Sequence, residues 1–410
     1  AFVWIGHFEA GMEEMIATLL DQKKLKHRVK FVGFVQDPMA YYAGASVYAL
    51  TSREDPFPNV VLESAEVGVP VVAFQEATGA ADFIVENGGR LAKKLDVEDF
   101  AIQVREILDG PGQKGFAAVG SMRQYLMDLL HHATGFQRVS VIVPNYNYAN
   151  HLLQRLRSIA DQSYPIYELI VLDDASTDGS IEAIDNFLTK RPELDGELIV
   201  NRENSGSVFR QWAKGVDRSR GDLVWIAEAD DFAELDFLKE LVPAFADPSL
   251  VLAYSQSGQL DGSGRVLAES YIDYTRDISD DWLSDYTKNG QAEIGEAMSI
   301  KNTIPNVSAV VFRRLAISKA IAEIGDELFS YHIAGDWLVY LRVLLQGKMR
   351  FCAKQLNWHR RHAHSVTQSE VAETHLSEVR RVQKLARSLL SVYPETRRKA
   401  DAWLEHVRTY

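Results

Sequence analysis

The sequence predicts an α/β protein with two domains and a helical C-terminal tail. Short apolar runs rich in β-branched residues alternate with segments of helical period, which is typical of βα units that build a mostly parallel sheet. The length of 410 residues corresponds to two or three domains of ordinary size. Because the strand and helix pattern restarts after Gly135, we predict domains at residues 1–135 and 136–368 and the tail at residues 369–410.

Four short strands are predicted in the first domain. Apolar runs at residues 2–5, 29–34, 47–50 and 69–74 have the length and composition of strands, and helical patterns separate them. An Asp-Gly-Pro-Gly sequence at residues 109–112 then breaks a helix.

The second domain repeats this pattern with stronger strands. Residues 139–143, 169–172 and 223–227 read as strands, and residues 151–162 read as a helix. Acidic residues follow the second and third of these strands. Because ligands of open α/β sheets bind outside the carboxyl ends of the strands, we expect both acidic clusters to face one crevice.

The last third of the chain contains a less regular segment and then the tail. Periodicity fades between residues 257 and 306, which predicts a long functional loop or an irregular insertion. Helical period returns from about residue 370. A solvated amphipathic face and docking on a membrane surface are the two readings of its basic residues. These are Arg380, Arg381, Lys384 and Arg387.

Composition and charge exclude several classes of protein. Hydrophobic residues at 46% and charged residues at 25% match an ordinary packed protein. The net charge of −13 disfavours binding to a phosphate polymer, so we expect no nucleic-acid partner. One cysteine, Cys352, excludes an intrachain disulfide and a cysteine-cluster metal site.

Targeting signals are not evident in the sequence. No run of about 18 apolar residues occurs, and the N-terminus lacks a basic segment followed by an apolar one. We therefore expect a cytoplasmic protein, with peripheral contact at the inner face of the membrane as an option. The chain opens without Met in a strand-like run, so we also expect it to be a fragment.

The first acidic cluster of the second domain holds Asp173, Asp174 and Asp178 directly after an apolar strand. Capping of the next helix by Ser176 or Asp178 accounts for one of these polar residues. It does not account for the adjacent pair. A carboxylate held at a strand end can accept the imide N–H of a uracil or thymine base, which suits nucleotide recognition.

The second cluster holds Glu228, Asp230 and Asp231 after the strand at residues 223–227. Alternate side chains there can converge on one hard cation, and oxygen ligands suit Mg²⁺ or Mn²⁺ together with substrate phosphates. Turn or capping chemistry is the alternative for an isolated acidic triplet. Two clusters at successive strand ends favour the metal.

Four motifs in the second domain carry a resemblance to a known family. Residues 139–147, residues 173–178, residues 227–231 and a later Gly335-Asp336-Trp337 occur in one order. Together they resemble family 2 glycosyltransferases of the GT-A fold over residues 137–367. The resemblance implies an inverting transferase that uses a nucleotide-diphospho-sugar and a divalent metal.

The same resemblance implies roles for individual residues. The metal segment would be Glu228, Asp230 and Asp231, with Glu228 where that family more often has Asp. Contacts to the donor base, sugar or diphosphate would come from a larger set of residues. That set is Pro144, Tyr146, Asp174, Asn204, Gly206, Gln211, Arg360, Arg361 and His362. Zinc binding by the histidines near residue 360 is an alternative that the preceding arginine pair makes less favoured.

Asp336 is the candidate general base. An acceptor hydroxyl must lose a proton as it attacks the anomeric carbon, and a nearby carboxylate can take that proton. His332, Trp337 and Tyr340 could hold a sugar acceptor by stacking and hydrogen bonding. The alternative is that Asp336 only caps the helix that begins at Trp337.

The first domain carries a second resemblance. Asp55 and Glu63 form an acidic pair with seven residues between them, at a turn that follows the strand at residues 47–50. Over residues 1 to about 110 this resembles the C-terminal, Rossmann-like half of family 4 glycosyltransferases of the GT-B fold. Glu63 would accept ribose hydroxyls and Asp55 would approach the sugar. A capped surface helix is the alternative. Because the other half is not in this sequence, we expect weak nucleotide binding without turnover.

These observations predict a tandem glycosyltransferase that moves a sugar to a glycan or lipid-linked acceptor in bacterial cell-surface polysaccharide synthesis. One alternative is a sugar-nucleotide nucleotidyltransferase, which is disfavoured because residues 144–147 lack a Gly-rich loop bearing Arg and Lys. The other alternative is a non-catalytic scaffold that binds nucleotides or glycans.

Overall fold

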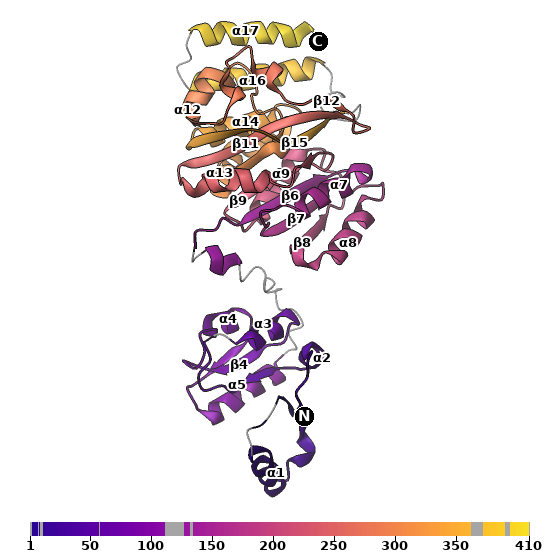
Figure 1. Cartoon of the computed structure of the whole chain (residues 1–410), viewed down its shortest axis with the longest axis vertical. Coiled ribbons are helices and arrows are strands. Elements are labelled where there is room, and N and C mark those ends of the chain that lie inside the picture. The colour runs from indigo at the N-terminus through magenta and orange to yellow at the C-terminus, as the bar shows by residue number, and fades with distance from the viewer. Residues whose placement is uncertain are drawn as a thin grey trace. The chain divides into compact units, whose positions relative to one another are not determined.

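A computed structural model of the chain describes residues 2–6, 8, 11–56, 58–110, 127–131, 134–361, 372–389 and 394–409. Contacts divide the chain into two compact units, residues 1–122 and residues 123–410 (Figure 1). Helices alternate with strands in both units, which confirms the predicted α/β class.

The first unit is built from short parallel strands. β1 (Phe2–Ile5) pairs with β2 (Val29–Gly33), and a separate sheet has the order β3-β4-β5. All four predicted strands are present, and β5 is one that the sequence did not predict. The other strands are β3 (Tyr48–Leu50), β4 (Val71–Phe74) and β5 (Arg90–Ala92), and the helices are α1 (Met12–Gln22), α2 (Met39–Ala43), α3 (Asn59–Glu66), α4 (Ala81–Glu86) and α5 (Val97–Asp109).

The second unit contains a mixed sheet with a parallel half. Strands follow the order β10-β15-β11-β14-β9-β6-β7-β8, with β9, β6, β7 and β8 parallel and β14 antiparallel to its neighbours. The parallel strands are β6 (Val139–Asn145), β7 (Glu168–Asp173), β8 (Gly196–Val200) and β9 (Leu223–Ile226). The others are β10 (Phe232–Ala233), β11 (Leu250–Asp261), β12 (Val266–Ala268), β13 (Tyr286–Asn289), β14 (Val310–Arg313) and β15 (Lys348–Arg361).

Helices cover both faces of this sheet, which explains why its central strands are continuously apolar. Ile142 and Val224 point to one face and share a core with α9 (Val208–Arg218), α13 (Arg314–Ile324) and α14 (Gly335–Leu344). Val141 and Trp225 point to the other face, where three other helices pack. These are α7 (Ala149–Ala160), α8 (Ser180–Lys190) and α10 (Phe237–Leu241).

The segment between residues 257 and 306 is more ordered than we expected. β11 extends through Asp261, and β12, α11 (Ile272–Thr275), β13, α12 (Gly290–Glu293) and a π-helix at Ile294–Met298 follow. The expectation of a long loop was wrong for β11 because its buried centre is polar. Ser255, Gln256 and Ser257 are all at most 5% exposed. The sequence therefore has no apolar run at this part of the strand that would indicate its burial.

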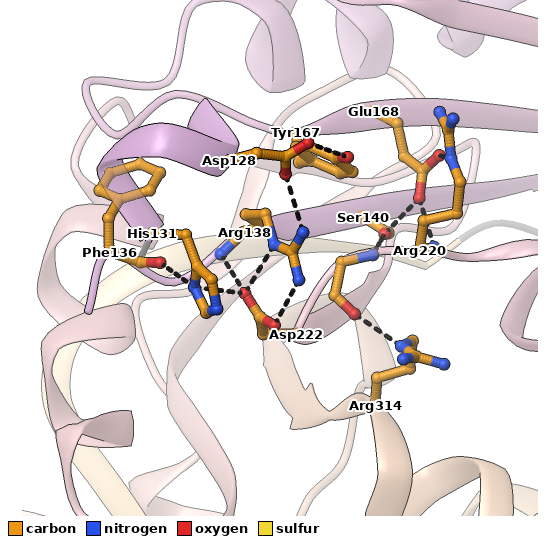
Figure 2. A network of polar contacts seen from close by, with 11 residues as sticks. Asp128, His131, Phe136, Arg138, Ser140, Tyr167, Glu168, Arg220, Asp222 and Arg314 are labelled. Carbon is orange, nitrogen blue, oxygen red and sulfur yellow. Dashed lines mark hydrogen bonds and ion pairs between the residues drawn. The ribbon is translucent and has the colours of Figure 1, made fainter. Parts of the chain in front are cut away.

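The amino ends of the parallel strands are tied together by ion pairs (Figure 2). Arg138, just before β6, donates to both carboxylate oxygens of Asp222 at 2.9–3.1 Å and to Asp128 at 2.8 Å. His131 Nδ1 lies 3.2 Å from Asp222. These bonds of Asp128 and His131 lie within the second unit. The domain boundary at residue 135 stays a prediction.

The C-terminal tail is helical, as predicted, and packs on the second unit. Its helices are α16 (Ala372–Leu389) and α17 (Pro394–Thr409). Val379, Val382 and Ala386 of α16 are buried in the core that contains α14. The apolar face of α16 is thus covered by the protein, while Arg380 and Lys384 are exposed. Within the described residues, no helix has both the length and the apolar character needed to span a bilayer.

Candidate active site

Side chains at the carboxyl ends of β6 and β7 first build a rigid turn. Asp173 is fully buried, and it accepts from Asn145 Nδ2 at 2.7 Å and from the main-chain N–H of Ser176 at 2.8 Å. Asp178 accepts from the N–H groups of Ala149 and Ser180 at 2.9 and 3.0 Å. Asp178 therefore has the capping role considered above, and Asp173 shapes the turn.

Asp174 joins this strand end to the loop before α9. Its carboxylate is 5% exposed and accepts from Asn201 Nδ2 at 2.6 Å, from Ser205 Oγ at 2.7 Å and from Gln211 Nε2 at 2.9 Å. Asn204 Oδ1 accepts from the N–H of Gly206 at 2.6 Å, and the positive φ of Gly206 (+69°) permits that turn. Two predicted donor-binding residues, Asp174 and Gln211, thus share one hydrogen-bond network, and Asn204 and Gly206 flank Ser205, which belongs to it.

Helix α9 connects the first acidic cluster to the second. Next to Gln211, Trp212 Nε1 donates to Glu228 Oε1 at 3.1 Å. On the same helix, Phe209 packs so closely on Gly335 that a Cβ there would lie 2.5 Å from its ring. Gly335 precedes Asp336, so α9 contacts all three regions where the sequence predicted function. Pro144 is buried in β6 and Tyr146 is 43% exposed.

The second cluster is strongly acidic and partly buried. Burial, followed by the charge of Asp230, raises the pKa of Glu228 to about 8. Asp231 is 2% exposed and accepts from Asn306 Nδ2 and from the N–H of Arg360, both at 2.8 Å. Arg155 is fully buried beneath the cluster, with Nη2 4.0 Å from Asp231 Oδ2 and Nε donating to the carbonyl of Glu228.

The three carboxylates do not form a ready-made metal cage. Among the described residues, no group of three His, Cys, Asp or Glu side chains is arranged to hold a metal ion. The donor chemistry still fits Mg²⁺ or Mn²⁺, because such ions are commonly held by one or two carboxylates together with water and substrate phosphates. Asp230, which is partly exposed, and Glu228 are the residues that could hold it.

Arg360 has different surroundings from those we expected for a diphosphate clamp. It is 4% exposed, and its guanidinium donates to the carbonyls of Asp230 and Asp261 and to Gln154 Oε1 at 2.8–3.2 Å. This arrangement anchors the acidic loop to β15 and directs the guanidinium into the protein. Arg361, the last residue of β15, hydrogen-bonds to the hydroxyl of Tyr271. His362 lies outside the described residues.

Asp336 lies in the first turn of α14, in a site that favours its protonated form. Its Oδ2 accepts from Asn302 Nδ2 at 3.1 Å and its Oδ1 from the N–H of Trp337 at 2.6 Å. Burial raises the pKa of Asp336 to about 7. The bond to Trp337 agrees with a capping contribution, but a cap alone does not require a half-buried carboxylate with a raised pKa.

Two tyrosines show that Asp336 and the acidic cluster share one region. Burial raises the pKa of the Tyr340 hydroxyl well above its usual value, and the charges of Asp336 and Glu228 act in the same direction. Tyr340 is fully buried, and its hydroxyl has no hydrogen-bond partner among the described residues. Tyr274, in α11, is half-buried; burial raises the pKa of its hydroxyl, and the charges of Tyr271 and Asp336 act in the same direction.

Several residues of this region were not singled out from the sequence. Asn302 and Asn306 lie in the segment whose periodicity fades, where only a general functional loop was predicted. Arg155 had a detectable signal, because it occupies the apolar face of α7 beside Leu152 and Leu156. An arginine on a face that must be buried predicts an acidic or carbonyl partner.

The first unit brings its own acidic pair together. Asp55 follows β3, and its N–H donates to the carbonyl of Ala77 at 2.8 Å. Glu63 lies on α3 and hydrogen-bonds to Tyr42. Burial is the main cause that raises the pKa of Tyr48, and the charges of Glu63 and Asp55 add to it. Gly79 approaches Pro56 so closely that a Cβ would lie 2.2 Å from its carbonyl oxygen. Asp55 and Glu63 therefore both lie near Tyr48.

Acidic side chains lie at the carboxyl edge of a parallel sheet, and one helix links them. Two sequence families match the two parts of this chain. Residues 140–299 match the family described as Glycosyl transferase family 2, and residues 1–110 match Glycosyl transferases group 1. The chain therefore contains segments of two glycosyltransferase families. More narrowly, it carries a family 2 domain in its second unit, preceded by a group 1 segment in its first, which confirms both resemblances.

Two curated proteins and one solved structure are similar to this chain. An uncharacterized glycosyltransferase of Nostoc is 22% identical over 243 residues, 59% of this chain and 70% of the relative. An uncharacterized glycosyltransferase of Haemophilus influenzae is 31% identical over 140 residues, 33% of this chain and 55% of the relative. Residues 1–349 of S. aureus TarS, solved in complex with UDP, align with a TM-score of 0.45 at 18% identity, covering 67% of this chain and 72% of that one.

Proposed function

We propose that the second unit transfers a sugar, with inversion, from a nucleotide-diphospho-sugar to a glycan or lipid-linked acceptor. The observation that carries this proposal is that Gln211, Trp212 and Phe209 of α9 contact Asp174, Glu228 and Gly335, respectively. A single rigid helix then sets the spacing between a nucleotide pocket, an acidic cation site and a general base.

Donor binding would use the turn at the end of β7 and the loop before α9. Asp174 and Gln211 form a polar wall, and the Oε1 atom of Gln211 is buried without a hydrogen-bond partner among the described residues. Tyr146 is exposed at the end of β6 and can stack on a base. We assign Pro144, Asn204 and Gly206 to the same pocket.

A divalent cation would be held by Asp230 and Glu228, with Asp231 positioned behind them. When bound, Mg²⁺ or Mn²⁺ would stabilise negative charge on the departing nucleoside diphosphate. The chain's own contribution is to keep these carboxylates close despite their repulsion. Arg155 and the hydrogen bond from Trp212 to Glu228 both offset that repulsion.

Asp336 would act on the acceptor. Its ionised carboxylate takes the proton of an acceptor hydroxyl as the hydroxyl oxygen attacks the anomeric carbon. The new glycosidic bond forms while the bond from that carbon to the diphosphate oxygen breaks with its electron pair. A pKa of about 7 suits this step, because the carboxylate is then half ionised near neutral pH and still a strong base.

The test is incubation of the full chain with a panel of UDP- and GDP-sugars, Mn²⁺ or Mg²⁺, and glycan or lipid-linked acceptors. We expect sugar transfer with release of a nucleoside diphosphate, and loss of transfer in chelator. Release of pyrophosphate would favour a nucleotidyltransferase, and binding without turnover would favour a scaffold. Either result would overturn the proposal.

The first unit and the cellular setting extend the proposal. Asp55 and Glu63 have the placement for donor contacts, so we assign this unit a nucleotide-binding role that needs a second half-domain for turnover. Synthesis of a cell-surface polysaccharide from a cytoplasmic nucleotide-sugar would place the reaction at the inner face of the membrane. UDP titration of the wild type against Glu63→Gln tests the first part, since unchanged binding would remove Glu63 from the site.

A further inference from the structure

We infer that Glu378, in the C-terminal helix α16, is a positioning residue for Asp336, so that the tail forms part of the acceptor side of the transferase site. The inference rests on the proposed role of Asp336 as general base. Glu378 forms no hydrogen bond with Asp336 or with the proposed donor-binding residues among the bonds described for it.

Glu378 holds the main chain that leads into α14. Its carboxylate is 4% exposed; Oε1 accepts from the N–H of His332 at 2.8 Å, and Oε2 accepts from those of Ile333 and Ala334, each at 2.9 Å. Successive main-chain N–H groups that converge on one point form a concave site that favours an anion. The carboxylate thus fixes the backbone two residues before Asp336.

A second contact from α16 reaches the other partner of Asp336. Gln383 is 2% exposed and its Nε2 donates to the carbonyl of Ile300 at 2.6 Å. Ile300 lies two residues before Asn302, whose amide donates to Asp336. One face of α16 therefore holds both the helix that carries the carboxylate and the segment that orients it.

Helix α17 supports the same region from the side. Trp403 packs edge to face against Trp337, with ring centroids 6.2 Å apart and planes at 84°. Trp337 directly follows Asp336, and its indole N–H donates to the carbonyl of Met298 at 3.0 Å. These contacts limit the movement of the first turn of α14.

Glu378 and Asp336 also interact through their charges. The groups whose charges act with Asp336 come from three elements: Tyr274 of α11, Tyr340 of α14 and Glu378 of α16. After burial, which is the main cause, the charge of Glu378 adds to the raised pKa of Asp336, and hydrogen bonds from Trp337 and Asn302 oppose it. Removing that charge should make Asp336 a more acidic group and a weaker base.

The experiment compares Glu378→Gln with Glu327→Gln in the full chain. Glu327 forms an exposed ion pair with Arg381 of α16 at 3.0 Å, so it tests the same junction between tail and body away from Asp336. Turnover is measured as transfer, or as slower hydrolysis of the donor, across pH. Binding of UDP and GDP with Mn²⁺ and the melting temperature are measured in parallel.

For Glu378→Gln we expect kcat to fall about tenfold to a hundredfold, because small displacements of a reacting group have effects of this size. The acidic limb of its pH profile for kcat should move to lower pH. Its nucleotide affinity should stay within about twofold of the wild type, because the proposed donor pocket is unchanged. Glu327→Gln should match the wild type in all of these. A wild-type kcat and pH profile for Glu378→Gln would overturn the inference, as would equal losses in both variants.

Two further variants keep the outcomes separate. If Asp336→Asn retains turnover, the proposed function of Asp336 fails; if it loses turnover while Glu378→Gln does not, only the inference about the tail fails. Should Glu378→Gln not fold, Gln383→Ala is the substitute. A lower kcat with unchanged nucleotide binding in that variant supports the inference, and an unchanged kcat overturns it.

Discussion

The two ends of the parallel strands in the second unit use acidic residues in opposite ways. At the amino ends, burial opposes ionisation of Asp222, but hydrogen bonds and charge from Arg138 outweigh it and hold the pKa of Asp222 below its usual value. At the carboxyl ends, burial and neighbouring acids raise the pKa of Glu228 to about 8, and burial raises that of Asp336 to about 7.

The amino ends of the strands therefore stabilise the sheet, whereas the carboxyl ends carry acidic side chains whose charge is not fully neutralised. At the amino ends two carboxylates each have a guanidinium partner: the partly buried Asp222 pairs with Arg138, and the buried Glu168 pairs with Arg220 at 2.8 Å (Figure 2). At the carboxyl ends the acids outnumber their partners. Sites of strained electrostatics are where a metal ion or a substrate can be stabilised on binding. Four predictions break or sharpen this contrast.

The largest expected effect is on turnover in Asp336→Asn. Loss of a general base should reduce kcat by a factor of about 10² to 10⁴. UDP or GDP binding with Mn²⁺ should be nearly unchanged, because Asp336 contacts Asn302 and Trp337 and not the donor wall at Asp174. Steady-state kinetics and calorimetric titration measure the two quantities. Asp326→Asn, an exposed change nearby, serves as the control, and wild-type turnover in Asp336→Asn would exclude it as the base.

The same substitution should make the protein more stable in alkaline conditions. A carboxyl group with a raised folded-state pKa stabilises the fold while protonated; that stabilisation is present below about pH 4 and is lost as the pH rises through about 7. Asp336→Asn should therefore unfold with a free energy higher than wild type at pH 8, on the order of 1–3 kcal/mol, and with little difference at pH 4. Urea denaturation at both pH values measures this. Equal stabilities at pH 8 would contradict the raised pKa.

At the opposite end of the strands, Asp222→Asn should lower the free energy of unfolding and leave turnover unchanged. The charged hydrogen bonds from Arg138 are partly exposed, so we expect a loss of about 2 kcal/mol near neutral pH. Because the pKa of Asp222 is lowered in the folded state, its stabilisation is present above about pH 4 and lost as the pH falls through the lower folded value. The gap between variant and wild type should thus narrow in acid. A gap independent of pH would show that the ion pair is not its cause.

The smallest effect is expected for Trp212→Phe. The variant keeps an aromatic ring of smaller size and removes the N–H that donates to Glu228 at 3.1 Å. Loss of one such bond is worth about 1 kcal/mol, or about fivefold in nucleotide affinity with Mn²⁺. Trp282→Phe is a matched control, since it removes an indole N–H that donates to Tyr254 away from the acidic cluster. Equal effects of the two changes would exclude a specific role for Trp212.

The sequence predicted the parts of this molecule that local pattern determines. An apolar strand followed by acids fixed the positions of Asp174 and Asp231 because strand polarity alone sends the carboxyl ends to one edge. The surroundings of Arg360 could not be predicted, since its carbonyl partners come from segments about 100 and 130 residues away in sequence. Glu378 was hidden for another reason. A glutamate on an amphipathic helix is ordinarily a surface residue, and only the packed tail buries it.

The contacts of Glu378 also have a consequence for how the protein matures. Its three main-chain donors precede it by 44–46 positions, and the indole that packs on Trp337 comes later still. During synthesis the sheet and its nucleotide edge can therefore assemble while the loop before α14 still has water as its only acceptor. A nascent chain interrupted before α16 would then lack the contacts that fix the backbone before Asp336. If the proposed site assignments hold, shortened products of this protein are expected to bind nucleotide without consuming it.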